Sequence, residues 1–205
     1  MANIRIKSQW FQSGTPKTPQ QTASAMAFIT WRVAQNTLKQ MRTASFDIEI
    51  GPQYFAFTRE VLVFLTQVLD RMASERMDAA SRTEFMTALV QRVAEILQEN
   101  EDGLMGVPPT GQASHYDQFI DLFNELADHY ADFGYDIEGP DFAFVRYLGH
   151  RIEALMPQKD HRWVVDQIMA SEVPDAIEML KRGMDGVLST EPRPPRAARH
   201  ATSGD

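Results

Sequence analysis

Five acidic side chains recur at every third or fourth position between residues 114 and 133. They are Asp117, Asp121, Glu125, Asp128 and Asp132. Apolar residues in the same segment recur with the same spacing, which predicts an amphipathic helix. At about 100° per residue, the two stripes lie on nearly opposite faces of that helix. A row of carboxylates has two chemical uses, since it can bind a metal ion or attract a positively charged partner.

The arrangement of these acids argues against a metal site. Carboxylate ligands in helical bundles project inward from facing helices, usually with Glu-x-x-His pairs, whereas these acids point away from the apolar residues. Glu125 and His129 are one residue too far apart for that motif. We therefore predict neither a metal nor a cofactor. A metal site would require groups to meet across the core, with Glu125, His129 or His150 facing Glu60 or Glu153.

Two other interpretations of the acids remain open. Like charges four residues apart destabilise an isolated helix by about 0.2–0.5 kcal/mol per pair, so another interaction must favour them. Between Arg92 and Arg146 the chain has twelve acidic residues and no Lys or Arg, so the rest of the chain, whose total charge is −8, carries +4. The acids either keep the protein soluble and pair with its own basic residues, or they dock a basic protein. Candidates for internal pairing are Arg32, Lys39 and Arg42.

A second pattern is a phrase that occurs twice. FDIEIGPQYFAFTR at residues 46–59 returns, two residues shorter, as YDIEGPDFAFVR at residues 135–146. Proline is favourable in the first turn of a helix, so we expect one helix to begin at Pro52 and another at Pro140. The recurrence predicts two quasi-repeated helical halves that arose by internal duplication.

The charged residues of the two copies match in order. Glu49 and Arg59 in the first copy correspond to Glu138 and Arg146 in the second. These residues form either two equivalent functional sites or two equivalent structural corners. At a structural corner, the carboxylate would favour the positive N-terminus of the helix and form a salt bridge with the arginine.

The elements that position these residues are predicted to be helices. No segment alternates β-branched and polar residues as strands do. The sequence therefore predicts an all-α fold, a single-domain bundle of about six or seven helices over residues 22–188. Its halves are residues 22–102 and 113–188, and the linker between them is the Gly- and Pro-rich segment 103–112. The helix before this linker is expected to end near Asn100.

One predicted helix and the two ends of the chain complete this organisation. The helix after Pro52 is expected to bury one apolar face, made of Phe57, Val61, Phe64, Leu65, Val68 and Met72. Residues 1–21 are expected to form an extended arm that carries the aromatic pair Trp10 and Phe11. Residues 189–205 have the composition of a disordered tail.

Composition narrows the class of protein. The 205-residue chain has no Cys, which excludes disulfides, a thiolate nucleophile and Cys-ligated metal sites. None of the common nucleotide-binding, zinc-protease or serine-hydrolase motifs occurs. The net charge of −8 argues against binding to duplex nucleic acid. No apolar run approaches the roughly 20 residues of a membrane span. We expect a soluble cytoplasmic protein, which could also form homo-oligomers.

These observations lead to one expected function and one alternative. We expect a non-enzymatic helical interaction protein, an adaptor, chaperone or regulator, that uses the acidic helix face to dock a protein partner with a basic surface. The alternative is a small-molecule or cofactor-binding protein whose pocket lies between the two halves, which would leave enzymatic activity open. The residues expected near that pocket are Arg59, Arg146, His129 and His150.

Overall fold

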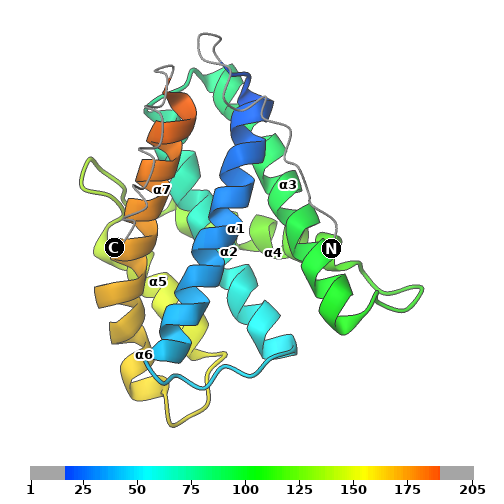
Figure 1. Ribbon diagram of the computed structural model, residues 1–205. Helices are drawn as coiled ribbons and strands as arrows, with labels where there is room; N and C mark the ends of the chain where they lie inside the picture. The colour runs from blue at the N-terminus through cyan, green and yellow to red at the C-terminus, as the bar shows by residue number, and fades with distance from the viewer. Residues whose placement is uncertain (1–16, 190–205) are drawn as a thin grey trace, which may run out of the picture.

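A computed structural model describes residues 17–189, which form helices joined by short connections (Figure 1). The helices are α1 (Pro19–Thr43), α2 (Pro52–Ser74), α3 (Ala79–Met105), α4 (His115–Ala131), α5 (Phe142–Glu153), α6 (His161–Gln167) and α7 (Val173–Leu188). A π-helical segment, Ile168–Glu172, connects α6 to α7 without a break, so the described residues form 6 helical rods. The predicted all-α bundle is confirmed, because residues 17–189 contain no strand.

The sequence predicts an extended arm at the N-terminal end of the chain and a disordered tail at the C-terminal end. Trp10 and Phe11, like residues 190–205, lie outside the described residues. The predicted arm ends at residue 21, but α1 already begins at Pro19. A capping box at its start, in which the side chains and backbone N–H groups of the cap and third helical residues bond reciprocally, explains this earlier start.

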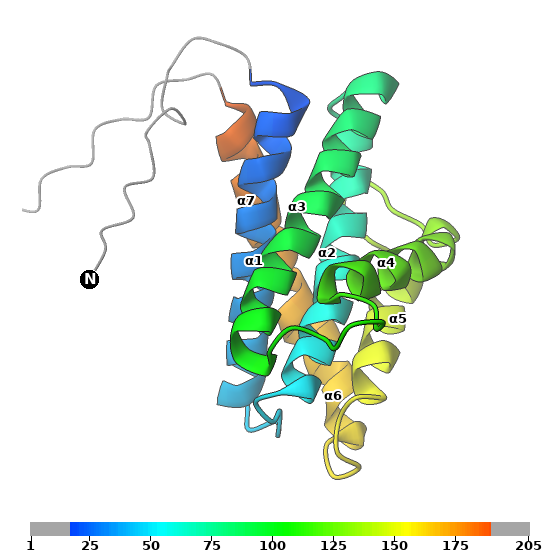
Figure 2. The same ribbon diagram turned by 90° about the vertical axis from the view of Figure 1, so that its right-hand side faces the viewer.

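Helix α2 is the central helix of the bundle. It contacts α1, α3, α4, α5 and α7, and Figure 2 shows α1 and α7 on one side of it and α4 and α5 on the other. Every residue from Glu60 to Leu69 is buried. The prediction of a single apolar face is therefore too narrow, because a helix that is apolar all round is buried all round. Within residues 17–189, no helix is long and apolar enough to span a membrane.

The predicted linker is shorter than its sequence suggests. Helix α3 continues past the predicted end near Asn100 and stops at Met105. Gly106, with φ of +86°, then ends the helix in a conformation that favours glycine. The first three residues of the segment 103–112 therefore belong to α3.

The helix after the second copy of the phrase starts later than predicted. Pro52 is the first residue of α2, as predicted, whereas α5 begins at Phe142 and not at Pro140. Asp141 is its N-cap, since Oδ1 accepts a hydrogen bond from the N–H of Phe144 at 2.8 Å. Aspartate is among the best N-cap residues, so the helix begins after it rather than at the proline.

The two copies of the phrase form two corners of the bundle, the first corner at residues 46–59 and the second corner at residues 135–146. Gly51 and Gly139 adopt nearly the same backbone conformation, with φ of +132° and +130°. Their surroundings differ, because Ile48 is 3% exposed and Ile137 is 92% exposed. The predicted pair of quasi-repeated halves is therefore not confirmed.

Candidate functional site

The predicted row of acids lies on α4, which packs on α2 and α3. Ser114 caps this helix, because its Oγ accepts a hydrogen bond from the N–H of Asp117 at 3.0 Å. The inner side of the helix buries Phe119, Leu126 and Tyr130. The amphipathic character predicted for this segment is confirmed, and its acids face away from the core.

These acids form one exposed surface, the acidic face, made of Asp117, Asp121, Glu125, Asp128 and Asp132. All five are exposed. The Asp117 carboxylate accepts a hydrogen bond from the Ser114 hydroxyl at 2.7 Å. In the part of the chain that the structure describes, none of the five takes part in a salt bridge. None of the five carboxylates is therefore in direct contact with a basic residue of the described bundle.

The interpretation that basic residues of α1 neutralise these acids is wrong. Arg42 donates Nε and Nη2 to the carbonyl oxygen of Ile48, at 3.0 and 2.6 Å. Arg32 and Lys39 are exposed, and neither forms a salt bridge with another residue between 17 and 189. Internal pairing with α1 therefore does not explain the acidic face.

A buried charged network holds the start of α4 against α2 and α3. Arg59 Nη2 lies 2.8 and 2.7 Å from the two carboxylate oxygens of Glu101. His115 Nδ1 lies 2.8 Å from Asp102 Oδ1, and His115 Nε2 lies 3.6 Å from Glu101. Burial raises the pKa of Glu101, while the Arg59 guanidinium opposes this rise. This network fixes the position of α4 and so orients the acidic face.

A second ion pair, with a buried carboxylate, links α2 to α5. Arg151 donates Nη2 and Nε to the two oxygens of Glu60, at 2.5 and 3.0 Å. The hydroxyl of Tyr130 is buried without a hydrogen-bond partner among the described residues. Burial, and then the charge of Glu60, raise the pKa of Tyr130 well above its usual range. Glu60 is therefore committed to Arg151 and is not free to bind a metal.

The structure does not bring together the residues of the metal and pocket hypotheses. His129 is exposed, with its ring 5.7 Å from that of Tyr147. His150 accepts a hydrogen bond from Arg146 Nε at 3.0 Å and lies 3.1 Å from Glu153. Arg146 and His150 thus share the exposed side of α5, apart from the network that contains Arg59. Between residues 17 and 189, no group of three or more His, Asp or Glu residues could hold a metal ion.

The charged residues of the two corners are not equivalent. Glu49 and Glu138 are exposed, and neither forms a salt bridge with a described residue. Arg59 is held by the buried network, whereas Arg146 lies over the ring of Phe142, 5.8 Å from its centroid. The prediction that each glutamate pairs with the arginine of its own corner is therefore wrong.

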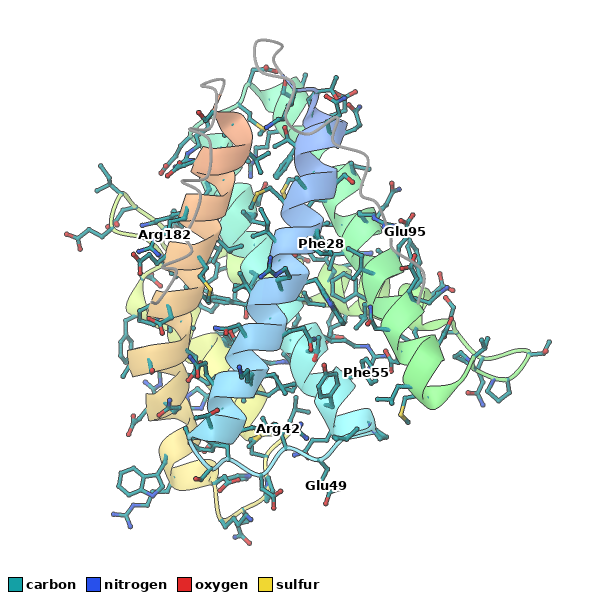
Figure 3. All side chains as sticks on the ribbon, viewed as in Figure 1. Phe28, Arg42, Glu49, Phe55, Glu95 and Arg182 are labelled. Carbon is teal, nitrogen blue, oxygen red and sulfur yellow. The ribbon has the colours of Figure 1, made fainter. Side chains whose placement is uncertain are left out.

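The structure contains a groove that the sequence did not predict. It has a volume of about 340 Å³ and lies between α1, α2 and α3. Its lining residues come from the first predicted half and the start of the predicted linker, so it does not lie between the halves. Its lining residues are Trp31, Gln35, Tyr54, Phe55, Asn100, Gly103 and Leu104. Phe55 lies near the start of α2 (Figure 3).

The buried network of Arg59, Glu101, Asp102 and His115 was also not predicted, although the sequence contained a pattern that indicates it. Val93, Leu97 and Glu101 are four residues apart, so Glu101 extends the buried face of α3. It was not recognised as part of this face because the helix was expected to end near Asn100. In comparisons with protein-family models, curated protein sequences and solved structures, no significant match to the chain was found, so its function must be inferred from its own residues.

Proposed function

We propose that this chain is a non-catalytic interaction protein that docks a partner with a basic surface through the acidic face of α4. One observation carries the proposal. All five carboxylates are exposed, and no described basic residue forms a salt bridge with any of them. An adaptor, a chaperone and a regulator all need such a surface, and the cytoplasm is the compartment in which we expect it to act.

The buried and half-buried acids of α2 and α3 are paired with basic residues, unlike the row of acids on α4, and this contrast supports the proposal. Glu60 and Glu101 are buried and paired with arginines, and Asp70 is paired with Arg82. On α4 the repulsion between neighbouring acids is left uncompensated, at a local cost of about 0.2–0.5 kcal/mol per pair. A basic partner would relieve this repulsion and would be attracted to the surface from a distance.

The acidic face is also presented rigidly. Its helix is capped at Ser114, packed on α2 and α3, and tied at its start by the network around Glu101. A rigid surface loses little conformational entropy when it binds. From Asp117 to Asp132 the face extends for about 22 Å at 1.5 Å per residue. It therefore suits a basic helix or strand-like segment of similar length, with arginines or lysines along one side.

A charge-reversal experiment tests this function. The face variant carries Asp121→Lys, Glu125→Lys and Asp128→Lys. The matched control carries Glu49→Lys, Glu84→Lys and Asp166→Lys, which reverses three exposed acids elsewhere and changes the net charge by the same amount. Full-length chains are immobilised, partners from the source cells are identified by mass spectrometry, and each purified partner is titrated at low and high salt.

We expect one partner that binds the face variant at least about tenfold more weakly than the parent chain. The same partner should bind the control variant less than about twofold more weakly than the parent. Its affinity should also fall with salt, because salt screens exposed charges. Equal binding by the parent, the face variant and the control would overturn the proposal, as would a loss that is the same for both variants.

A further inference from the structure

The groove between α1, α2 and α3 has walls suited to aromatic side chains. Tyr54 and Phe55 form one wall, with ring centroids 5.0 Å apart in an edge-to-face arrangement, and Trp31 contributes from α1. Leu104 at its rim is 55% exposed, and the nearby Val107 is 76% exposed. Apolar side chains of this size that stay exposed beside a groove mark a binding surface.

The polar groups of the groove narrow the choice of occupant. Tyr54 donates its hydroxyl to Oε1 of Gln35, and the Nε2 of Gln35 is buried without a hydrogen-bond acceptor. Asn100 donates Nδ2 to the carbonyl oxygen of Ile96 at 2.7 Å, which leaves its side-chain oxygen as an acceptor. One free donor and one free acceptor match a peptide group, which has one carbonyl oxygen and one N–H. The groove therefore fits a peptide that carries aromatic side chains.

The chain itself contains such a peptide within reach. Trp31 and Gln35 lie 12 and 16 residues beyond the start of α1 at Pro19, or about 18–24 Å along the helix. Trp10 lies nine positions before Pro19, and a chain segment of this length can extend for about 30 Å. The segment between Trp10 and the start of α1 is therefore long enough for Trp10 and Phe11 to reach the groove. It is also short enough to keep the two side chains near the groove.

Charge favours the same occupant. The first acidic residue of the chain is Asp47, and the segment before α1 includes Arg5 and Lys7. On α3, Glu99 is exposed next to the groove residue Asn100, and its carboxylate lies 3.9 Å from Arg92. Glu95, which points outward from this helix in Figure 3, is already paired with Arg92 at 2.6 Å. A basic peptide that follows α3 toward the groove would meet the opposite charge of Glu99.

We propose that the groove is the binding site of the chain's own N-terminal segment, with Trp10 and Phe11 as the side chains that fill it. The aromatic walls hold the two rings, and the Gln35 and Asn100 amides bond to the backbone between them. This inference does not depend on the proposed function of the acidic face, which lies on a different helix.

Introduced cysteines test this inference, because the chain has none of its own. The test pair is Gln12→Cys with Gly103→Cys. Gly103 lines the groove, and a Cβ atom there meets nothing within 4 Å, so this substitution creates no clash with the surrounding residues. The control pair is Gln12→Cys with Gly186→Cys, where a Cβ atom also meets nothing within 4 Å. The rate of disulfide formation in the full-length chain is followed on non-reducing gels.

If the N-terminal segment does not dock in the groove, the control pair should form its disulfide faster than the test pair. Lys17 Nζ lies 2.5 Å from the carbonyl oxygen of Val187, so position 186 is close to the point where the segment joins α1. An undocked segment would therefore reach position 186 more often than position 103. We expect the test pair to form its disulfide at least about tenfold faster than the control pair, because docking raises the effective concentration of one thiol near the other. Equal rates, or a faster control, would overturn the inference.

Replacing Trp10 and Phe11 tests whether these two side chains hold the segment in the groove. Adding Trp10→Ser and Phe11→Ser to both pairs should make the test pair slower than the control pair, with unchanged melting temperatures. A rate that survives this change shows that these side chains do not hold the segment. A disulfide between two chains, increasing with protein concentration, shows that the groove takes a second copy instead. Either result overturns the inference.

Discussion

The two corners of the bundle share a phrase and one backbone conformation, yet they are built into the structure differently. In the first corner Ile48 is 3% exposed and Phe55 is 2% exposed, whereas in the second corner Ile137 is 92% exposed and Phe142 is 66% exposed. The corners agree at the glycine, where φ is +132° and +130°. The phrase therefore specifies the turn, while the surrounding helices decide which of its side chains are buried.

One local difference within the phrase, Asp141 in place of Gln53 and Tyr54, accounts for part of this contrast. The first corner has no side-chain cap, so α2 begins at the proline directly after Gly51. The second corner has Asp141 in this region, and this residue both caps α5 and accepts a hydrogen bond from the N–H of Gly134 at 2.9 Å. The helix then begins only at Phe142. Phe142 thus lies in the first turn of its helix, at the surface, whereas the matching Phe55 is already inside α2.

The largest expected contrast concerns these two phenylalanines. Phe55→Ala should lower the free energy of unfolding by about 3–5 kcal/mol, because it removes a buried ring and leaves a cavity. Phe142→Ala should lower it by less than about 1 kcal/mol, since it removes only an exposed ring and its contact with Arg146. Urea unfolding followed by circular dichroism measures both. Equal losses would mean that the corners are equivalent after all.

The two arginines provide the next contrast. Arg59→Met should destabilise the chain by about 3 kcal/mol at neutral pH, because it leaves the carboxylate of Glu101 buried without its partner. Arg146→Met should cost less than about 1 kcal/mol, since Arg146 is exposed and contacts only Phe142 and His150. The same unfolding measurement tests this pair. A small effect of Arg59→Met would show that the buried network does not hold α4.

The pH dependence of these variants sharpens the contrast. Burial raises the pKa of Glu101, so the folded chain binds a proton there at a pH at which the unfolded chain has released it. The resulting stability is present at low pH and is lost as the pH rises through the raised pKa. Loss of Arg59 raises this pKa further, because its charge and hydrogen bonds favour the ionised carboxylate. The stability gap between the parent and Arg59→Met should therefore narrow as the pH falls from neutral toward the ordinary glutamate pKa.

A double variant controls this titration. Adding Glu101→Gln to Arg59→Met should remove the narrowing, since no carboxylate then remains to take up the proton. Narrowing that persists in the double variant would assign the pH response to another group.

Local patterns in the sequence were sufficient for some of these features and not for others. The helical spacing of the apolar residues predicted the all-α fold and the outward direction of the acids on α4, because both follow from a single helix and its period. The central position of α2 and the opposite exposures of Ile48 and Ile137 depend on helices far away in the sequence. The groove and the pairing of Arg59 with Glu101 depend in the same way on how three helices meet. No periodicity within one segment contains that information.

The smallest expected effect is also the test of what the corners share. Gly51→Ala and Gly139→Ala should each destabilise the chain by about 1–3 kcal/mol, because a residue with a Cβ atom is strained at a φ near +130°. No steric clash contributes, since a Cβ atom at either position meets nothing within 4 Å. Gly103→Ala is the matched control, with equal space in an ordinary helical conformation, and it should be neutral or slightly stabilising. Thermal unfolding of the three variants measures these effects. If Gly139→Ala were harmless while Gly51→Ala were not, the two corners would not share even the turn, and the phrase would have no common structural meaning.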